Sequence, residues 1–211
     1  MSARSILGIA ALAVAIPLAL TGCVQPDPNA TSGSGDPSPT ASDSTTPSPE
    51  PTESGPTALP ADCAALVATA DPAQFGDAPL NDPVFVPQGP SGVVVPVPPP
   101  ADADARQTMR AIHELWCLWA DPAADITHLS VEVGHIDATA AEALVGDLQA
   151  DGYEYTDANG GTQCAIVTPN SQFPVDDEFT YLFRDDVAIL VDQTNFPTNG
   201  LMASIVEVIW G

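Results

Sequence analysis

Residues 24–60 limit what this chain can fold into, because they cannot form a packed core. The segment holds nine prolines and thirteen serines or threonines, and it has no aromatic residue, lysine or arginine. Such a composition buries too little apolar surface to offset the entropy lost on ordering. We therefore expect a disordered linker here, which leaves residues 61–211, about 150 positions, for a single globular domain.

The residues before this linker predict export and lipid attachment. Residues 6–20 form an apolar run after Arg4, too short for a stable membrane span and typical of a secretory signal. Leu20-Thr21-Gly22-Cys23 matches the lipobox of bacterial lipoproteins, in which the chain is cut before an acylated cysteine. We expect a signal peptide over residues 1–22 and a lipid on Cys23. The alternative is an ordinary signal peptide with an incidental cysteine.

The expected lipid determines where the protein resides. A diacylglyceryl group on Cys23 would hold the chain durably at the extracytoplasmic face of the cell membrane, since two acyl chains anchor far better than one. The lipidated linker, residues 23–60, would then lift the domain away from the membrane surface. The membrane is therefore the first expected partner, and it is reached through the lipid.

The charge of the chain argues against anionic partners. There are 28 aspartates and glutamates, four arginines and no lysine, which gives a formal net charge of −24. Nucleic acids and anionic lipid headgroups are bound by clustered Lys or Arg side chains, so we expect no nucleic-acid partner. The acidity favours a neutral or basic partner, or it serves solubility alone.

The first half of the domain predicts helices followed by a strand pair. We expect a helix over residues 61–76 and another ending near Ile112. Residues 115–119 are rich in strand-forming aromatics, and residues 127–133 alternate apolar and polar side chains, so we expect these segments to pair as strands. A single long helix over residues 103–119 is the alternative.

Between these elements lies a proline-rich stretch, and a second series of elements follows them. The prolines over residues 80–104 predict a long surface loop, in which Phe85 and residues 93–97 form a candidate binding surface. Further along, Thr139 and Glu142 have the spacing of a capping box that begins a helix. Two hairpins are expected next, with turns at residues 157–161 and 184–186, and then a last helix from Thr198 or Asn199.

These elements predict an α+β fold. We expect an antiparallel sheet with helices packed on one face. A strand pair followed by a helix occurs twice, over residues 114–150 and 178–210, which suggests a duplicated hairpin–helix unit.

The lipobox, the Ser/Thr/Pro-rich linker, the early Cys63 and the motif Cys117-Leu118-Trp119 resemble small secreted lipoproteins of actinobacteria that have no known function. The resemblance implies a disulfide between Cys63 and Cys117, and it supplies no catalytic residues. Lipidation of Cys23 leaves three thiols, so one cysteine remains unpaired. The sequence also leaves open a Cys117–Cys164 pair; otherwise Cys164 is a buried thiol.

No motif in the chain specifies a chemistry, and we expect no metal, cofactor or catalytic residue. His128 and His135 are seven apart, which predicts opposite faces of one strand rather than a shared metal site. The acids at residues 176–178 and 185–186 are the candidates for a calcium site. We expect a non-enzymatic binding or accessory module of the cell envelope, with an envelope protein as partner. The alternative is an enzyme or enzyme accessory acting on cell-wall polysaccharide, which would need a pocket with converging carboxylates or histidines.

Overall fold

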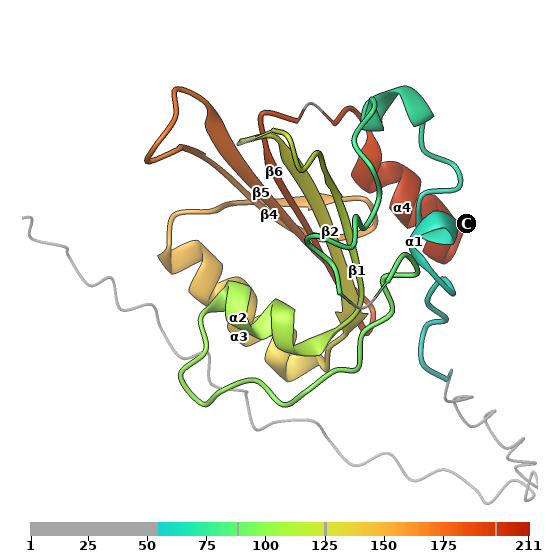
Figure 1. Cartoon of the computed structure of the whole chain (residues 1–211). Coiled ribbons are helices and arrows are strands. Elements are labelled where there is room, and N and C mark those ends of the chain that lie inside the picture. Colours follow the sequence, from blue (N-terminus) through green and yellow to red (C-terminus); the bar gives the residue numbers. More distant parts are fainter. Residues whose placement is uncertain (1–54, 88, 125, 197) are drawn as a thin grey trace, which may run out of the picture. The chain divides into compact units, whose positions relative to one another are not determined.

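A six-stranded antiparallel sheet forms the centre of the computed structural model, which describes residues 55–87, 89–124, 126–196 and 198–211 (Figure 1). The strand order is β1-β2-β6-β5-β4-β3, and every neighbouring pair is antiparallel. The strands are β1 (His113–Ala120), β2 (His128–His135), β3 (Glu154–Ala158), β4 (Gly161–Pro169), β5 (Asp176–Arg184) and β6 (Val187–Thr194). The predicted α+β class is confirmed.

Helices cover both faces of this sheet, so the expectation of helices on one face is wrong (Figure 1). The helices are α1 (Cys63–Leu66), α2 (Ala105–Ile112), α3 (Ala138–Ala150), α4 (Leu201–Trp210) and a short 3-10 helix, Pro72–Phe75. One core forms under α1 and α4, and a second forms under α2 and α3. The reason lies in β6, where every residue is buried: Ile189 packs into the first core and Leu190 into the second. A strand that is apolar on both sides needs cover on both sides.

The two hairpin–helix units do not match in space. Helix α3 follows the β1–β2 hairpin and packs on one face, whereas α4 follows the β5–β6 hairpin and packs on the other. Because β2 and β6 are antiparallel neighbours, only a twofold axis perpendicular to the sheet would exchange the two hairpins. Such an axis would place both helices on the same face of the sheet. The duplicated unit is therefore not confirmed.

Several element boundaries differ from the sequence expectation. The helix expected over residues 61–76 is split into α1 and the 3-10 helix, because the residue before Pro72 is disfavoured in helical geometry. Asp62 caps α1 and accepts a hydrogen bond from the Ala65 amide at 2.8 Å. Helix α3 is capped by Asp137 through the Ala140 amide at 2.9 Å, so the predicted capping box at Thr139 is wrong. Helix α4 begins after Gly200.

The predicted strand pairs are present. Strand β1 contains residues 115–119 and pairs with β2, so the alternative of one long helix is wrong. The two later hairpins are β3–β4 and β5–β6. Asn159 and Gly160 have positive φ in the first turn, and Asp185 has positive φ in the second. These are the residue types that tolerate the left-handed conformation.

The proline-rich segment lies along the outer edge of β1. The Val94 amide donates to the Glu114 carbonyl at 2.8 Å, and the Trp116 amide donates to the Gly92 carbonyl at 2.8 Å. The side chains of Val93, Val95 and Val97 remain exposed. The segment is thus at the surface, as predicted, and it also pairs with a strand edge that would otherwise be open.

A disulfide and a buried asparagine connect α1 and this segment to β1. Cys63 and Cys117 are bonded with an S–S length of 2.05 Å, so the predicted disulfide is confirmed. Asn81, with a φ of 50°, accepts a hydrogen bond from the Leu118 amide at 2.8 Å. Its side-chain amide donates to the Pro90 carbonyl at 3.2 Å. The Asn81 side chain thereby gives one buried backbone N–H an acceptor and one backbone carbonyl a donor, as a strand residue would do.

The residues just before Ala61 also contact the fold. The Thr57 amide donates to Asp186 Oδ2 at 3.1 Å. Hydrogen bonding by Thr57, first by its side chain and to a smaller extent by this amide, lowers the pKa of Asp186. His135 Nε2 donates to the Thr57 carbonyl at 2.9 Å, and its Nδ1 lies 2.5 Å from Glu114 Oε1. The contacts of the folded part therefore begin before the predicted domain boundary.

These contacts also change the titration of His135. Burial opposes protonation of the imidazole, but the hydrogen bonds to Glu114 and Thr57 and the charges of Glu114 and Asp186 outweigh it. The pKa of His135 is therefore raised above its ordinary value of 6.5.

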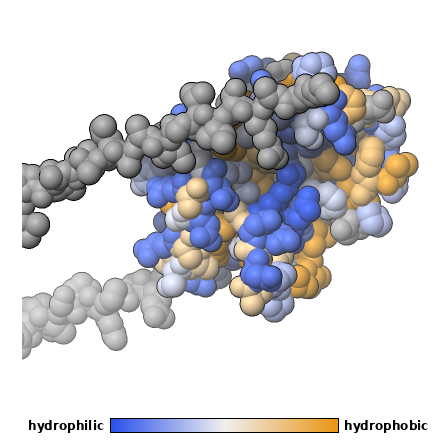
Figure 2. All heavy atoms as spheres, turned by 90° about the vertical axis from the view of Figure 1, so that its left-hand side faces the viewer, coloured by the Kyte–Doolittle hydropathy of each residue, from blue (hydrophilic) through white to orange (hydrophobic). Residues whose placement is uncertain are grey.

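Much of the face shown in Figure 2 is hydrophilic, with hydrophobic residues gathered toward one side. This view looks onto the molecule from the left-hand side of Figure 1. Among the described residues, no helix has both the length and the apolar character needed to cross a membrane.

Candidate ligand-binding pocket

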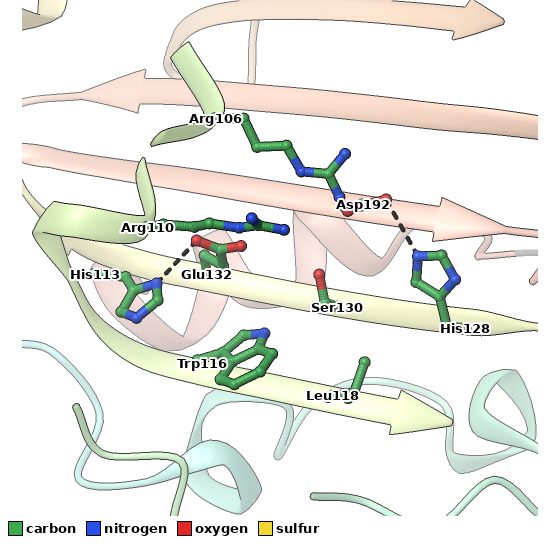
Figure 3. Close-up of a pocket in the computed structure, with 9 residues that line it drawn as sticks. All are labelled: Arg106, Arg110, His113, Trp116, Leu118, His128, Ser130, Glu132 and Asp192. Carbon is green, nitrogen blue, oxygen red and sulfur yellow. Dashed lines mark hydrogen bonds and ion pairs between the residues drawn. The ribbon is translucent and has the colours of Figure 1, made fainter. Parts of the chain in front are cut away.

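A pocket of about 500 Å³ opens beside α2 on the face of the sheet that α2 and α3 cover (Figure 3). Its walls come from α2, β1, β2 and β6. The lining residues are Arg106, Arg110, His113, Trp116, Leu118, His128, Ser130, Glu132 and Asp192. Two of the four arginines and two of the three histidines of this acidic chain therefore meet at one place.

The alternation of β2 places polar side chains in this pocket. His128, Ser130 and Glu132 share one face of the strand, whereas the apolar residues between them belong to the core under α1 and α4. Asp192 joins them from β6, because the β2–β6 register sets it opposite Ser130. An irregularity in the β1–β2 pairing after His113 lets that residue line the pocket together with Trp116.

Asp192 is the centre of the first charge cluster. Its carboxylate is buried, at 3% exposure, and it forms an ion pair with the Arg106 guanidinium. His128 Nε2 lies 3.4 Å from the other carboxylate oxygen (Figure 3). The Arg106 guanidinium also lies over the ring of Phe179, 4.9 Å from its centroid. Asp192 and Phe179 thus hold Arg106 in place, and the negative charge of Asp192 is matched within the pocket.

Glu132 is the centre of the second cluster. Its carboxylate is also buried, at 3% exposure, and Oε2 lies 2.8 Å from His113 Nδ1. The His113 ring in turn lies nearly parallel to the Trp116 indole, with centroids 6.3 Å apart. The imidazole therefore partners a buried carboxylate and supports a flat aromatic wall.

Arg110 differs from its neighbour Arg106. Its side chain is exposed, and Figure 3 shows it extending from α2 across the pocket above Glu132. Within the part of the chain that the structure describes, its guanidinium has neither a hydrogen-bond acceptor nor an ion-pair partner. The pocket thus contains one arginine whose five donors are free for a ligand.

The residues singled out from sequence lie mostly elsewhere. The disulfide of Cys63 and Cys117 belongs to the core under α1 and α4, on the opposite face of the sheet. Cys23 lies outside the described residues. Cys164 is unpaired and buried in the other core, so the alternative Cys117–Cys164 bond is wrong. Burial raises the pKa of its thiol.

The histidines and acids of the sequence analysis do not gather. His128 lines the pocket, whereas His135 lies at the other end of β2. The acids at residues 176–178 begin β5 and those at 185–186 follow its end, so they are separated by the length of the strand. Within the described ranges, no three Asp, Glu, His or Cys side chains are close enough to hold a metal ion.

Sequence reasoning singled out only His128 among the ionisable residues of the pocket and missed five: Arg106, Arg110, His113, Glu132 and Asp192. A signal was present for three of them. The two arginines are four apart, which places them on one side of a helix. Asp192 directly follows the apolar run 187–191, where an ionised side chain is costly without a partner, whereas Glu132 occupies a polar position of an alternating strand and gives no such signal.

Comparisons with protein-family models, curated proteins and solved structures gave no match for this chain.

Proposed function

We propose that this chain is a lipid-anchored, extracytoplasmic binding module that takes a small ligand into the pocket beside α2. Cys23 would carry the lipid, and the residues between it and Thr57 would link it to the folded part. The observation that carries the proposal is the state of the pocket's charges: each buried carboxylate already has a cationic or hydrogen-bonding partner, while Arg110 extends into the open space.

The arrangement favours binding over catalysis. A nucleophilic mechanism needs a hydroxyl or thiol within hydrogen-bond reach of a base. Ser130 lines the pocket, but no hydrogen bond joins it to His113 or His128 among the described side chains. The carboxylates of Asp192 and Glu132 are instead used to hold Arg106 and His113 in position. Fixed, preoriented donors around a partly apolar space are typical of a ligand-binding site.

One observation favours the alternative, an enzyme or accessory acting on cell-wall polysaccharide. Glu132 and Asp192 are two buried carboxylates in the same pocket, and glycoside hydrolysis uses such a pair. The alternative predicts release of soluble sugars from wall polysaccharide, with complete loss in Glu132→Gln and Asp192→Asn.

The anchor and the pocket are tested separately. For the anchor, the wild-type protein should sediment with membranes after expression in its host, and Cys23→Ala should appear in the soluble extracytoplasmic fraction. A wild-type protein that is soluble would contradict the lipid anchor and would leave the pocket proposal unaffected.

For the pocket, the side-chain indole N–H signals provide a direct measurement. The three tryptophans are Trp116 in the pocket, Trp119 stacked on Phe75, and Trp210 under Arg184. Residues 24–211, labelled with ¹⁵N, are titrated with the small-molecule fraction of an envelope extract. A ligand should shift the Trp116 signal and leave the other two in place. No shift at Trp116 would contradict a binding function for this pocket.

A further inference from the structure

We infer that the ligand of this pocket is a small ring-containing molecule with a single carboxylate, which Arg110 binds through its guanidinium. This inference rests on the proposed binding function and adds the chemical class of the ligand. It follows from three features of the pocket: the arginine that forms no ion pair among the described residues, the aromatic wall and the buried Glu132.

The charge argument begins with Arg106 and Arg110. They are four residues apart on α2, and both reach the pocket. The charge of Arg106 is compensated by Asp192, so this residue mainly positions the neighbouring side chains. Arg110 is uncompensated in the described structure and points over the open space. A guanidinium presents two parallel donors, which match the two oxygens of a carboxylate.

The opposite wall sets the shape of the ligand. Trp116 and Leu118 come from adjacent same-side positions of β1, and both line the pocket. The Trp116 indole lies nearly parallel to the His113 ring, at 11°, which fixes its orientation. An aromatic ring, or the C–H face of a sugar ring, can lie against this indole while the carboxylate of the ligand reaches Arg110.

The buried Glu132 sets the charge of the ligand. The charge of Asp192 is matched by Arg106, but Glu132 is also nearly inaccessible to solvent and forms no ion pair with an arginine among the described residues, so its field in the pocket is weakly screened. A second negative charge on the ligand would be repelled by Glu132, whereas one negative charge is matched by Arg110. The pocket therefore favours a monocarboxylate over a phosphate monoester, which carries nearly two charges at neutral pH.

The test compares each acid with its own uncharged counterpart. Residues 24–211 labelled with ¹⁵N are titrated with a panel of ring-containing carboxylic acids and with the corresponding primary amides. The panel includes benzoic, indole-3-acetic, glucuronic and N-acetylmuramic acids, and phenyl phosphate as the dianion. The Trp116 indole signal reports binding, and the Trp119 and Trp210 signals are internal controls.

The expected result is that acids shift the Trp116 signal and that their amides bind at least about tenfold more weakly, since a hydrogen-bonded charge pair is lost. Arg110→Gln should remove this preference, and Arg110→Lys should restore part of it. Arg184→Gln, which changes an arginine outside the pocket, should bind like the wild type.

Three results would overturn the inference: amides that bind as well as acids, acid binding that survives in Arg110→Gln, or phenyl phosphate as the preferred ligand. Each of these would leave the binding function intact, because Trp116 would still report a ligand. If the whole panel leaves Trp116 unmoved while an envelope extract shifts it, the carboxylate inference alone fails. If the extract also has no effect, the proposed function fails.

Discussion

Removing the Cys63–Cys117 disulfide should cost a large part of the stability of the folded unit. The bond joins residues 54 apart in sequence and connects α1 to the middle of β1. Reduction leaves the sequence unchanged, so it isolates the effect of the covalent link from any effect of substitution.

The size of the effect follows from the length of the closed loop. In the chain-entropy description, closing a loop with this separation lowers the entropy of the unfolded chain enough to stabilise the folded state by about 4 kcal/mol. Folded domains are stable by about 5 to 15 kcal/mol in total, so the reduced protein should remain folded but marginal.

The assay is urea unfolding of residues 24–211, followed by tryptophan fluorescence, with and without a phosphine reductant. The midpoint should fall clearly on reduction, and the dependence on urea should steepen, because the reduced unfolded chain is more expanded. The Cys63→Ala/Cys117→Ala double variant should resemble the reduced protein.

Cys164→Ala is the control for reduction, since it removes the unpaired thiol and keeps the disulfide. Its stability should still fall on reduction by the same amount. A loss smaller than about 1 kcal/mol in the wild type would refute the loop argument and would mean that the unfolded chain is already compact around these residues.

Three further perturbations test other features. In Gly92→Ala, the new Cβ would lie 2.2 Å from Cys63 Sγ, and residue 92 would keep a φ of +72° that alanine disfavours. The free-thiol content should therefore rise, and the protein should unfold at a lower urea concentration than the wild type. Gly89→Ala is its control, with a φ of +94° and open space, and should cost only about 1 kcal/mol. Asn81→Ala should destabilise the protein by about 3 kcal/mol in urea unfolding, because it leaves the Leu118 amide without its acceptor. The raised pKa of His135 gives stability that is fully present below pH 6.5 and is lost as pH rises through the folded-state pKa. The unfolding free energy should therefore fall with rising pH in this window, and His135→Gln should flatten that dependence; an unchanged slope would contradict it.

The strands could be predicted because their signals are local. The alternation over residues 127–133 and the turn at Asn159 are each contained in a few neighbouring positions, and both are found in the structure. The cap of α3 could not be predicted in this way, since Asp137 and Thr139 are both residue types that cap helices and the structure uses Asp137.

The faces of the sheet and the pocket could not be predicted, because both depend on pairing between distant segments. Arg106 and Asp192 are 86 residues apart in sequence, and they meet only because β6 returns to pair with β2 and α2 packs on the same face. No local pattern gives that register. The apolar run of β6 indicated a strand, but the need for helices on both faces follows from its central place in the sheet.

The Thr57 contacts and the disulfide also determine the path along which a pulling force, applied to the chain before Gly55, would be transmitted into the fold. The hydrogen bonds of Thr57 with Asp186 and His135 would resist first and would break, since they are few and partly exposed. Residues 57–62 could then extend by about 20 Å at most before the tension reached Cys63. From there the disulfide would pass the force directly to Cys117, so residues 64–116 would carry no load. The tension would arrive at β1, the strand farthest in the sheet from β3, and all six strands would keep their order until β1 is pulled from β2.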